Sequence, residues 1–261
     1  MVCWLIMGIL DFFQKKVEYE TLQGEELKKV AESGDPRAQL ILANAYFDGQ
    51  GFKQDFEIAH KWYVRSAQQG LSEAQYRLGS LHEKGQGTVQ SDKDALKWYR
   101  KAADQGHAQA QFTLGSMYYT GVGLPQDDFE ARKWYKFAAE QGHAQAQNSL
   151  AGMYYYSRGV KLKNEKLQAA RWYHEAAKQG ILNAQYQLGL MYYQGDSIPI
   201  NNVLSRVWCA LASKQGKAEA ARYKSLLDSK LTNEELEESN QYLQGDPSQI
   251  PIGFDIPEEE E

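Results

Sequence analysis

The chain has 261 residues, of which 43% are apolar and 24% are charged, and its formal net charge is -5. This composition is that of a soluble protein with enough apolar material for a sizeable core, and the acidic balance argues against a nucleic-acid-binding surface. The two cysteines, Cys3 and Cys209, exclude a disulfide framework. No apolar run reaches the roughly 18 residues of a membrane-spanning helix.

Residues 1–23 form an apolar to amphipathic N-terminal segment that begins with the apolar stretch Met1–Phe13. A secretory signal would place basic residues before its apolar run and a small-residue cleavage site after it. Here the first basic residue is Lys15, so we expect a short buried or frayed segment of a cytoplasmic protein. A membrane-surface anchor is the alternative, and Met7 is a second candidate start residue.

A short capping helix is expected at 24–33, and a periodic array follows it. Tryptophans recur at spacings of 36, 36, 38 and 36 residues, and a glycine stands eight residues after each of them. These tryptophans are Trp62, Trp98, Trp134, Trp172 and Trp208. The glycines divide 34–216 into five repeats, which are 34–69, 70–105, 106–141, 142–179 and 180–215. Fixed periods of this length are typical of solenoid proteins.

Each repeat is predicted to contain two helices. In the third repeat, Ala110, Leu114 and Met117 are spaced for one face of a first helix. A glycine-rich loop then leads to a residue that can cap a second helix by accepting free backbone amide hydrogens. These expected caps are Asp55, Ser91, Asp127 and Asn201. Paired alanines in the second helix permit close helix packing, so stacked pairs form one all-α solenoid.

The fourth repeat is two residues longer than the others. We place the insertion in the loop near 157–164, with the second helix beginning at Asn164 or Glu165. In most other repeats a glycine directly follows the first-helix leucine, whereas in the fourth repeat this glycine is displaced to Gly152. The insertion is either neutral loop variation or a segment that contacts a partner.

The chain is expected to close with capping helices over 217–244. Thr232 and Glu235 form a capping-box pattern before the last of these helices. The tail 245–261 contains three prolines and ends in an acidic run, so it is expected to be extended or disordered and solvated.

The pattern G-x-x-x-A-Q-x-x-L-G-x-x-Y, followed by A-x-K-W-Y-x-x-A-A-x-Q-G, resembles the Sel1-like repeat, a relative of the tetratricopeptide repeat. The resemblance covers 34–216 closely and implies a right-handed α-solenoid that binds other proteins as a scaffold or adaptor. Bacterial relatives include proteins that neutralise secreted toxins. A cysteine-rich secreted branch is associated with β-lactam binding, and this chain lacks the cysteine pair of each repeat in that branch.

The sequence contains no catalytic or metal-binding motif that we recognise. The five histidines include no H-E-x-x-H pattern, and the Gly-x-Gly pairs lie between helices without the Lys-Ser/Thr of a phosphate loop. We therefore predict no catalytic residue, no metal and no cofactor.

The candidate binding residues lie on the side of each first helix opposite the core. At 100° per residue, these are positions four, seven, eleven and fourteen of each repeat, called the groove positions below because they line the concave groove in the family that the chain resembles. The predicted partner-binding residues are Phe47, Tyr76, Gln109, Phe112, Tyr119, Gln145, Tyr155, Asn183, Tyr186 and Tyr193. Aromatic residues are common anchors of protein interfaces. The alternative for the seventh-position aromatics is packing between neighbouring first helices.

The sequence thus predicts a non-enzymatic scaffold that binds a peptide segment or domain of another protein, with a bacterial regulatory or immunity protein as the specific version. The alternatives are a β-lactam- or peptidoglycan-binding enzyme-like relative and a membrane-tethered assembly scaffold. No nucleic-acid partner is expected, and the oligomeric state is left open.

Overall fold

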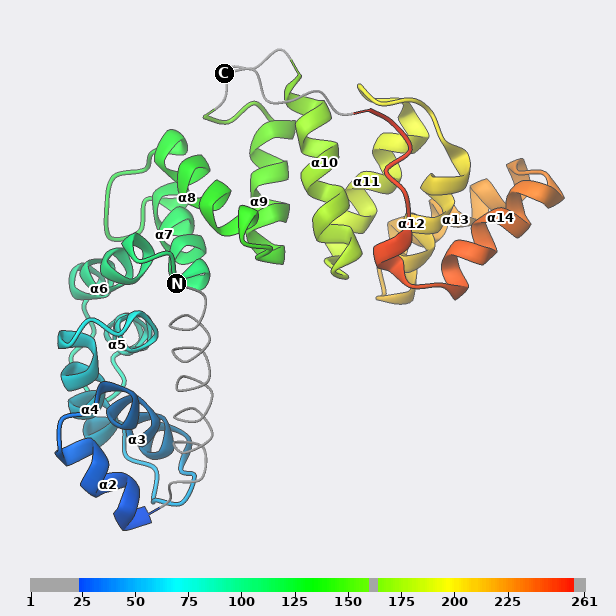
Figure 1. Ribbon diagram of the computed structural model, residues 1–261. Helices are drawn as coiled ribbons and strands as arrows, with labels where there is room; N and C mark the ends of the chain where they lie inside the picture. Colours follow the sequence, from blue (N-terminus) through cyan, green and yellow to red (C-terminus); the bar gives the residue numbers. More distant parts are fainter. Residues whose placement is uncertain (1–23, 160–163, 256–261) are drawn as a thin grey trace, which may run out of the picture. The chain divides into compact units, whose positions relative to one another are not determined.

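A computed structural model describes residues 24–159 and 164–255 (Figure 1). Within these ranges the chain has 13 α-helices, one short 3-10 helix and no strand. The helices are α2 (Gly24–Glu32), α3 (Pro36–Asp48), α4 (Phe56–Gln68), α5 (Ser72–Lys84), α6 (Asp92–Asp104), α7 (Ala108–Thr120), α8 (Asp128–Glu140), α9 (Ala144–Tyr155), α10 (Glu165–Lys178), α11 (Leu182–Gln194), α12 (Asn202–Lys214), α13 (Ala218–Lys230), α14 (Asn233–Gln244) and η1 (Pro247–Gln249). The segment Met1–Phe13, expected to be buried or frayed with a membrane-surface anchor as the alternative, lies outside the described residues, as does the final acidic run.

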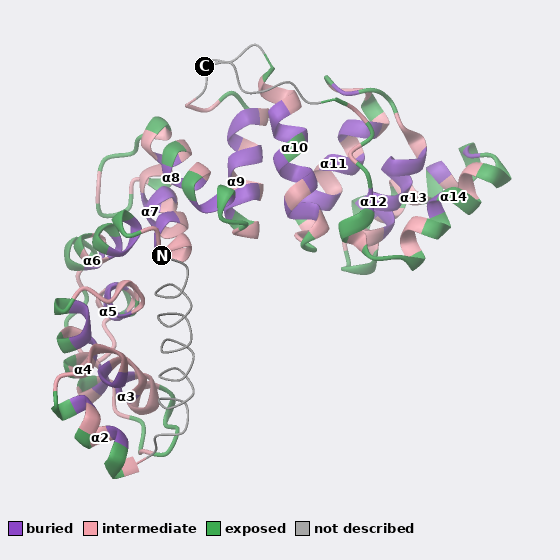
Figure 2. Cartoon of the chain, viewed as in Figure 1, coloured by how far each residue is buried: buried purple, intermediate pink, exposed green. Residues whose placement is uncertain are grey.

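Helices that follow one another in the chain pack together, as in a solenoid of helix pairs. First and second helices of one repeat meet in α3–α4, α5–α6, α9–α10 and α11–α12, and second helices contact the next first helix in α4–α5, α8–α9 and α10–α11. The chain divides into two compact units within α7, at 114–115. Buried residues lie along the faces where neighbouring helices of each unit meet (Figure 2).

The predicted second-helix caps are confirmed. Asp55, Ser91, Asp127 and Asn201 are each the N-cap residue, and each side chain accepts a hydrogen bond from a backbone amide of the first turn. The longer fourth repeat begins its second helix after Asn164, which makes no such side-chain bond. The repeated boundary therefore comes from local hydrogen bonding that the sequence specifies.

The cores of the first four repeats are built from small residues and one tyrosine of the second helix, and the fifth repeat has Cys209 in place of the tyrosine. The alanine pairs of the second helices are at most 1% exposed, which lets neighbouring helices approach closely. The second-helix tyrosines Tyr63, Tyr99, Tyr135 and Tyr173 are between 1% and 4% exposed. A Cβ atom on Gly79 would lie 2.8 Å from the ring of Tyr99, so this glycine is required for the ring to lie against the first helix.

The C-terminal helices are joined to the last repeat by a buried arginine. Arg206 in α12 is 7% exposed. Its guanidinium lies 2.6 Å from an oxygen of Asp228 in α13, and it donates hydrogen bonds to the side chains of Ser239 and Asn240 in α14. The predicted capping box of Thr232 and Glu235 begins α14. A buried charge needs such partners, and they hold α13 and α14 against the repeat array.

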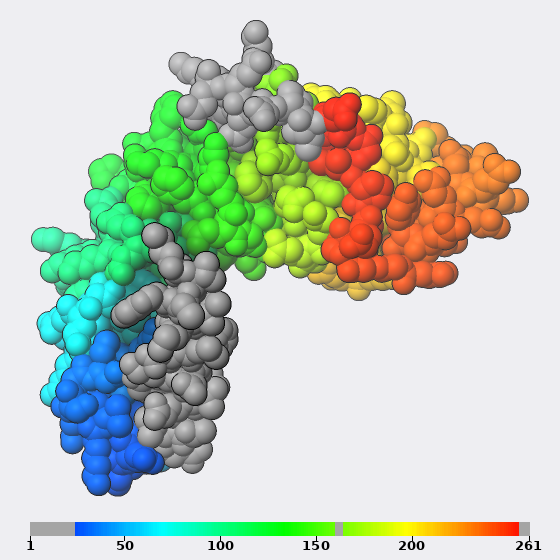
Figure 3. Space-filling model, viewed as in Figure 1, coloured from blue at the N-terminus to red at the C-terminus, as the bar shows by residue number. Residues whose placement is uncertain are grey.

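The tail up to Asp255 packs on the protein, which differs from the solvated tail that we expected. Ile250 is 2% exposed, and its carbonyl oxygen lies 2.8 Å from Nε2 of His174 in α10. The Tyr192 hydroxyl in α11 donates to the carbonyl oxygen of Ile252. The red segment in Figure 3 accordingly lies over these helices. The reason is tertiary: an apolar side chain finds a buried site, and side chains remote in sequence satisfy the backbone carbonyls.

Candidate functional site

The ten predicted binding residues lie on the first helices α3, α5, α7, α9 and α11, and none of them is fully buried. Gln145 and Asn183 are exposed, and the other eight are half-buried. Their positions leave them accessible for contact, while their binding role stays a prediction.

A cation from a later segment lies over each fourteenth-position tyrosine of the second unit. The guanidinium of Arg158 is 4.2 Å from the centre of the Tyr119 ring, and Lys166 Nζ is 5.2 Å from that of Tyr155. Lys230 Nζ is 5.6 Å from the ring centre of Tyr193. Cation–π contacts of this kind restrict the rings, so these tyrosines are held in place although they are half-exposed.

Two of these cations, Arg158 and Lys166, also form ion pairs with aspartates of neighbouring repeats. Arg158, in the loop after α9, makes two 3.0 Å contacts to Asp128 at the start of α8. Lys166, at the start of α10, lies 2.8 Å from Asp196 in the loop after α11. Lys166 lowers the pKa of Asp196. The Tyr155 hydroxyl also donates a hydrogen bond to Asp196. Burial, together with this hydrogen bond, raises the pKa of Tyr155 to about 12.

The seventh-position tyrosines Tyr76 and Tyr186 each contact an aromatic ring of the next first helix or of the residue just before it. Tyr76 stacks on the imidazole of His107 with 5.0 Å between ring centres. Tyr186 lies 6.5 Å from the ring of Tyr223. For these two residues the contacts are those of the packing alternative.

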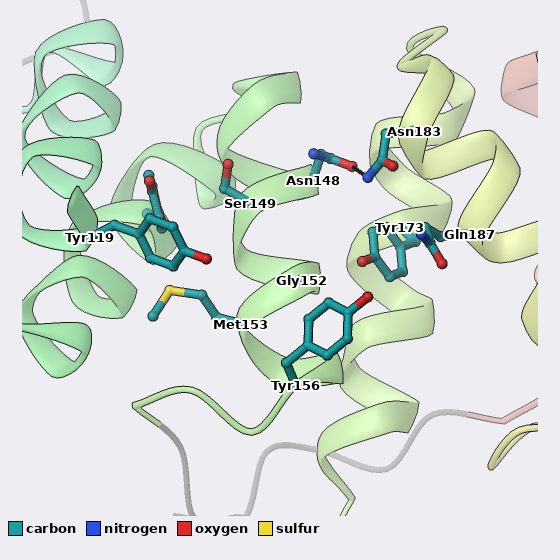
Figure 4. A pocket seen from close by; sticks show the side chains of 10 residues that line it. Tyr119, Asn148, Ser149, Gly152, Met153, Tyr156, Tyr173, Asn183 and Gln187 are labelled. Carbon is teal, nitrogen blue, oxygen red and sulfur yellow. Dashed lines mark hydrogen bonds between the residues drawn. The ribbon is translucent and has the colours of Figure 1, made fainter. Parts of the chain in front are cut away.

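A pocket of about 310 Å³ opens in the second unit, between helices α7 and α11 (Figure 4). Residues at all four groove positions line it, together with two second-helix tyrosines. The lining consists of Tyr119, Tyr135, Asn148, Ser149, Gly152, Met153, Tyr156, Tyr173, Asn183 and Gln187. None of these side chains is charged, and most carry a hydroxyl or a carboxamide. The pocket therefore suits hydrogen bonding to an uncharged group.

The pocket lies where the fourth repeat lacks a side chain that other repeats have. The hydroxyl of Tyr63 lies 2.6 Å from Oδ1 of Asn44, and the hydroxyl of Tyr135 lies 3.1 Å from Oγ of Ser116. Asn44 and Ser116 occupy position eleven, and the fourth repeat has Gly152 there. Tyr173 consequently faces open space instead of a hydrogen-bonding side chain.

Sequence reasoning identified only part of this pocket. Of the ten predicted binding residues, Tyr119 and Asn183 line it, and the other eight do not. The residues that it missed include Gly152 and Tyr173. The available signal was Gly152, a position that we interpreted only as a displaced glycine and not as the loss of a hydrogen-bonding partner.

The described residues offer no group of three or more histidine, cysteine or acidic side chains that could hold a metal ion. Cys209 is fully buried in α12, and burial raises the pKa of its thiol to about 12, so the thiolate that reacts as a nucleophile is disfavoured. In the part of the chain that the structure describes, no helix has the length and apolar character to cross a membrane.

The family of the chain follows from comparison with known proteins. The Sel1 repeat family model matches five consecutive segments, 36–71, 72–107, 108–143, 144–181 and 182–217. The chain belongs to the Sel1 repeat family, and its fold is the Sel1 and tetratricopeptide type of α-solenoid. Each match begins two residues after the glycine that opens the corresponding repeat in the sequence.

Solved structures of other Sel1 repeat proteins are similar to this one. A Sel1 repeat protein from Oxalobacter formigenes is 34% identical, with a TM-score of 0.67, over 73% of this chain and 77% of its own. A protective antigen present in uropathogenic Escherichia coli strains is 30% identical, with a TM-score of 0.54, over 86% of this chain and 56% of its own. This chain therefore spans little more than half of that antigen. No curated protein matches the sequence.

Proposed function

We propose that the chain is a non-enzymatic scaffold that binds a partner protein through the groove positions of its first helices. The observation that carries this proposal is the uncharged, hydrogen-bonding pocket of the second unit, which residues at all four groove positions line. The half-exposed tyrosines beside it are held by cations and ion pairs, and such pre-ordered side chains lose little entropy when a partner binds. The Sel1 solenoid supplies the rigid support for this surface.

The test is capture of partners on immobilised full-length protein, followed by mass spectrometry and by titration of each purified candidate. The Tyr119→Ala, Tyr155→Ala double variant is expected to lose the partner while its circular dichroism spectrum stays that of the wild type. Phe129→Ala, which removes an exposed aromatic side chain of α8 in the same unit, serves as an aromatic control outside the groove positions. If no purified candidate binds the wild-type chain, or if the double variant binds as tightly as the wild type, the proposal is wrong.

A narrower version makes the partner a bacterial toxin or signalling protein, with this chain as its immunity or regulatory protein. An adjacent toxin-like reading frame in the genome, and rescue of toxin-expressing cells by this chain, would support it. An enzyme-like or wall-binding role is tested separately, with a chromogenic β-lactam and with purified peptidoglycan. We expect neither turnover nor binding.

A further inference from the structure

The Tyr173 hydroxyl opens into the pocket and has no protein partner among the described residues. The side chain is 2% exposed, and residues 24–159 and 164–255 provide no hydrogen bond to its hydroxyl. The oxygen points into the pocket, toward Tyr156 and Tyr119 (Figure 4). Burial holds the ring in place while the protein leaves the hydroxyl unpartnered, so a group bound in the pocket can use both its donor and its acceptor capacity.

Steric crowding does not explain the missing side chain at Gly152. A Cβ atom built there would meet only the Tyr173 hydroxyl, at 3.7 Å, which is ordinary van der Waals contact. By contrast, a Cβ atom on Gly79 or Gly115 would lie 2.8 Å from a tyrosine ring. The helix would therefore accept serine at 152, as it does at Ser116 in the third repeat, and serine would place a hydroxyl where the pocket now is.

The uncharged lining of the pocket favours an uncharged occupant. None of the pocket's side chains is charged, and a charged group moved from water into such a site would lose hydration without gaining a counter-charge. Tyrosine and serine hydroxyls and the carboxamides can each both donate and accept hydrogen bonds. Asn148 and Asn183 are already oriented by the 3.0 Å hydrogen bond from Nδ2 of Asn183 to Oδ1 of Asn148.

A carboxamide matches this mixed set without carrying charge, because it presents its two N–H donors and its acceptor oxygen on separate atoms. A carboxylate would use only the donors, and an ammonium group would use only the acceptors. The volume of about 310 Å³ is at the lower end of the range for small-molecule sites. It fits one side chain with part of its backbone and excludes a folded domain or a large cofactor.

We propose that this pocket binds one glutamine or asparagine side chain of a partner protein segment, with the Tyr173 hydroxyl hydrogen-bonded to its carboxamide. The inference rests on the proposed function and specifies the partner residue that the second unit recognises. Gly152 is then a specificity-determining position, because the absence of its side chain creates the space.

The test uses blocked single residues as probes, with the full-length chain observed by NMR. N-acetylglutamine N-methylamide is expected to bind with a dissociation constant on the order of millimolar, and to shift signals of residues in α9 and α10. The glutamate and lysine counterparts are expected to bind at least tenfold more weakly. Equal binding of either charged probe, or no binding of the glutamine and asparagine probes, would overturn the proposal.

Two variants and one matched control locate the binding. Gly152→Ser is expected to weaken the glutamine probe at least tenfold while the melting temperature stays equal to or above that of the wild type. Tyr173→Phe is expected to weaken it several-fold, and Tyr63→Phe, which removes the same hydroxyl from the first repeat, is expected to leave it unchanged. Undiminished binding to a well-folded Gly152→Ser chain contradicts the assignment, as does N-acetylglucosamine displacing the glutamine probe from the pocket.

The partner capture described above keeps the two proposals distinguishable. If the wild-type chain and Gly152→Ser bind a purified partner equally, the pocket assignment falls and the scaffold function stands. If the wild-type chain binds no partner, the scaffold function falls as well.

Discussion

The third and fourth repeats bury equivalent side chains in their cores. They differ in whether the hydroxyl of the second-helix tyrosine has a hydrogen-bonding partner in the protein. Leu114 and Leu150 are both fully buried, and Tyr135 and Tyr173 are 4% and 2% exposed. The Tyr135 hydroxyl meets Ser116, whereas the Tyr173 hydroxyl faces the gap that Gly152 leaves. A repeat can therefore keep its packing and still open a pocket, because the eleventh position contributes a hydrogen bond and no core volume.

The largest effect is expected from the shared core. Leu114→Ala and Leu150→Ala each remove a fully buried side chain, so each should lower the free energy of unfolding by about 2–5 kcal/mol. Urea unfolding followed by circular dichroism measures both. A loss at Leu150 far below that at Leu114 would show that the fourth repeat is loosely packed, and the comparison would fail.

Alanine at two helical glycines should act in opposite directions. At Gly79 the new methyl group would clash with the Tyr99 ring, which costs about 1–3 kcal/mol. At Gly152 there is no clash, and replacing a helical glycine stabilises by up to about 1 kcal/mol. Melting temperatures should therefore fall for Gly79→Ala and rise or stay level for Gly152→Ala. A clear destabilisation by Gly152→Ala would mean that the glycine is needed for folding.

Removing the hydroxyl of Tyr135 or of Tyr173 should change the free energy of unfolding by different amounts. Tyr135→Phe should cost about 1 kcal/mol, because it breaks the hydrogen bond to Ser116. Tyr173→Phe should change the free energy of unfolding little, since its hydroxyl has no protein partner among the described residues. Chemical denaturation of the two variants and the wild type provides the comparison. Equal losses would reveal a partner for Tyr173 and remove the basis of the pocket assignment.

The smallest expected effect is a pH-dependent change in stability that comes from the contact between His107 and Glu73, outside the pocket. The hydrogen bond between His107 and Glu73 lowers the pKa of the Glu73 carboxyl from 4.5 to about 2 in the folded chain. A carboxyl whose pKa is depressed by folding stabilises the protein above the unfolded pKa, and this stabilisation is lost as the pH falls from about 4.5 toward 2. The Glu73 side chain is 38% exposed, so the effect is screened and modest.

Melting temperatures between pH 5.5 and about 2.5 measure this contribution. The wild-type chain should lose more stability across that window than Glu73→Gln does. Parallel curves would show that the carboxyl has the same pKa in the folded and unfolded chains.

The sequence specified most of the fold because its determinants are local and repeated. The tryptophan spacing defines the repeats, and caps such as Asp55 and Asn201 start helices through their own side chains. The tail was mispredicted because Ile250 is buried through contacts with α10 that no local pattern reveals. The pocket was largely missed for a related reason. It depends on the absence of a side chain at Gly152 and on the direction of the Tyr173 hydroxyl, which only the packed structure shows.

In the fourth repeat, stability and recognition depend on different side chains, and a paired calorimetric titration can separate them. The partner identified by capture is purified and titrated calorimetrically into Gly152→Ser and into Gly79→Ala, at a temperature where both variants are folded. Relative to the wild type, Gly152→Ser is expected to keep its stability and lose at least tenfold in affinity, whereas Gly79→Ala is expected to lose stability and keep its affinity. Undiminished binding to folded Gly152→Ser would contradict this expectation.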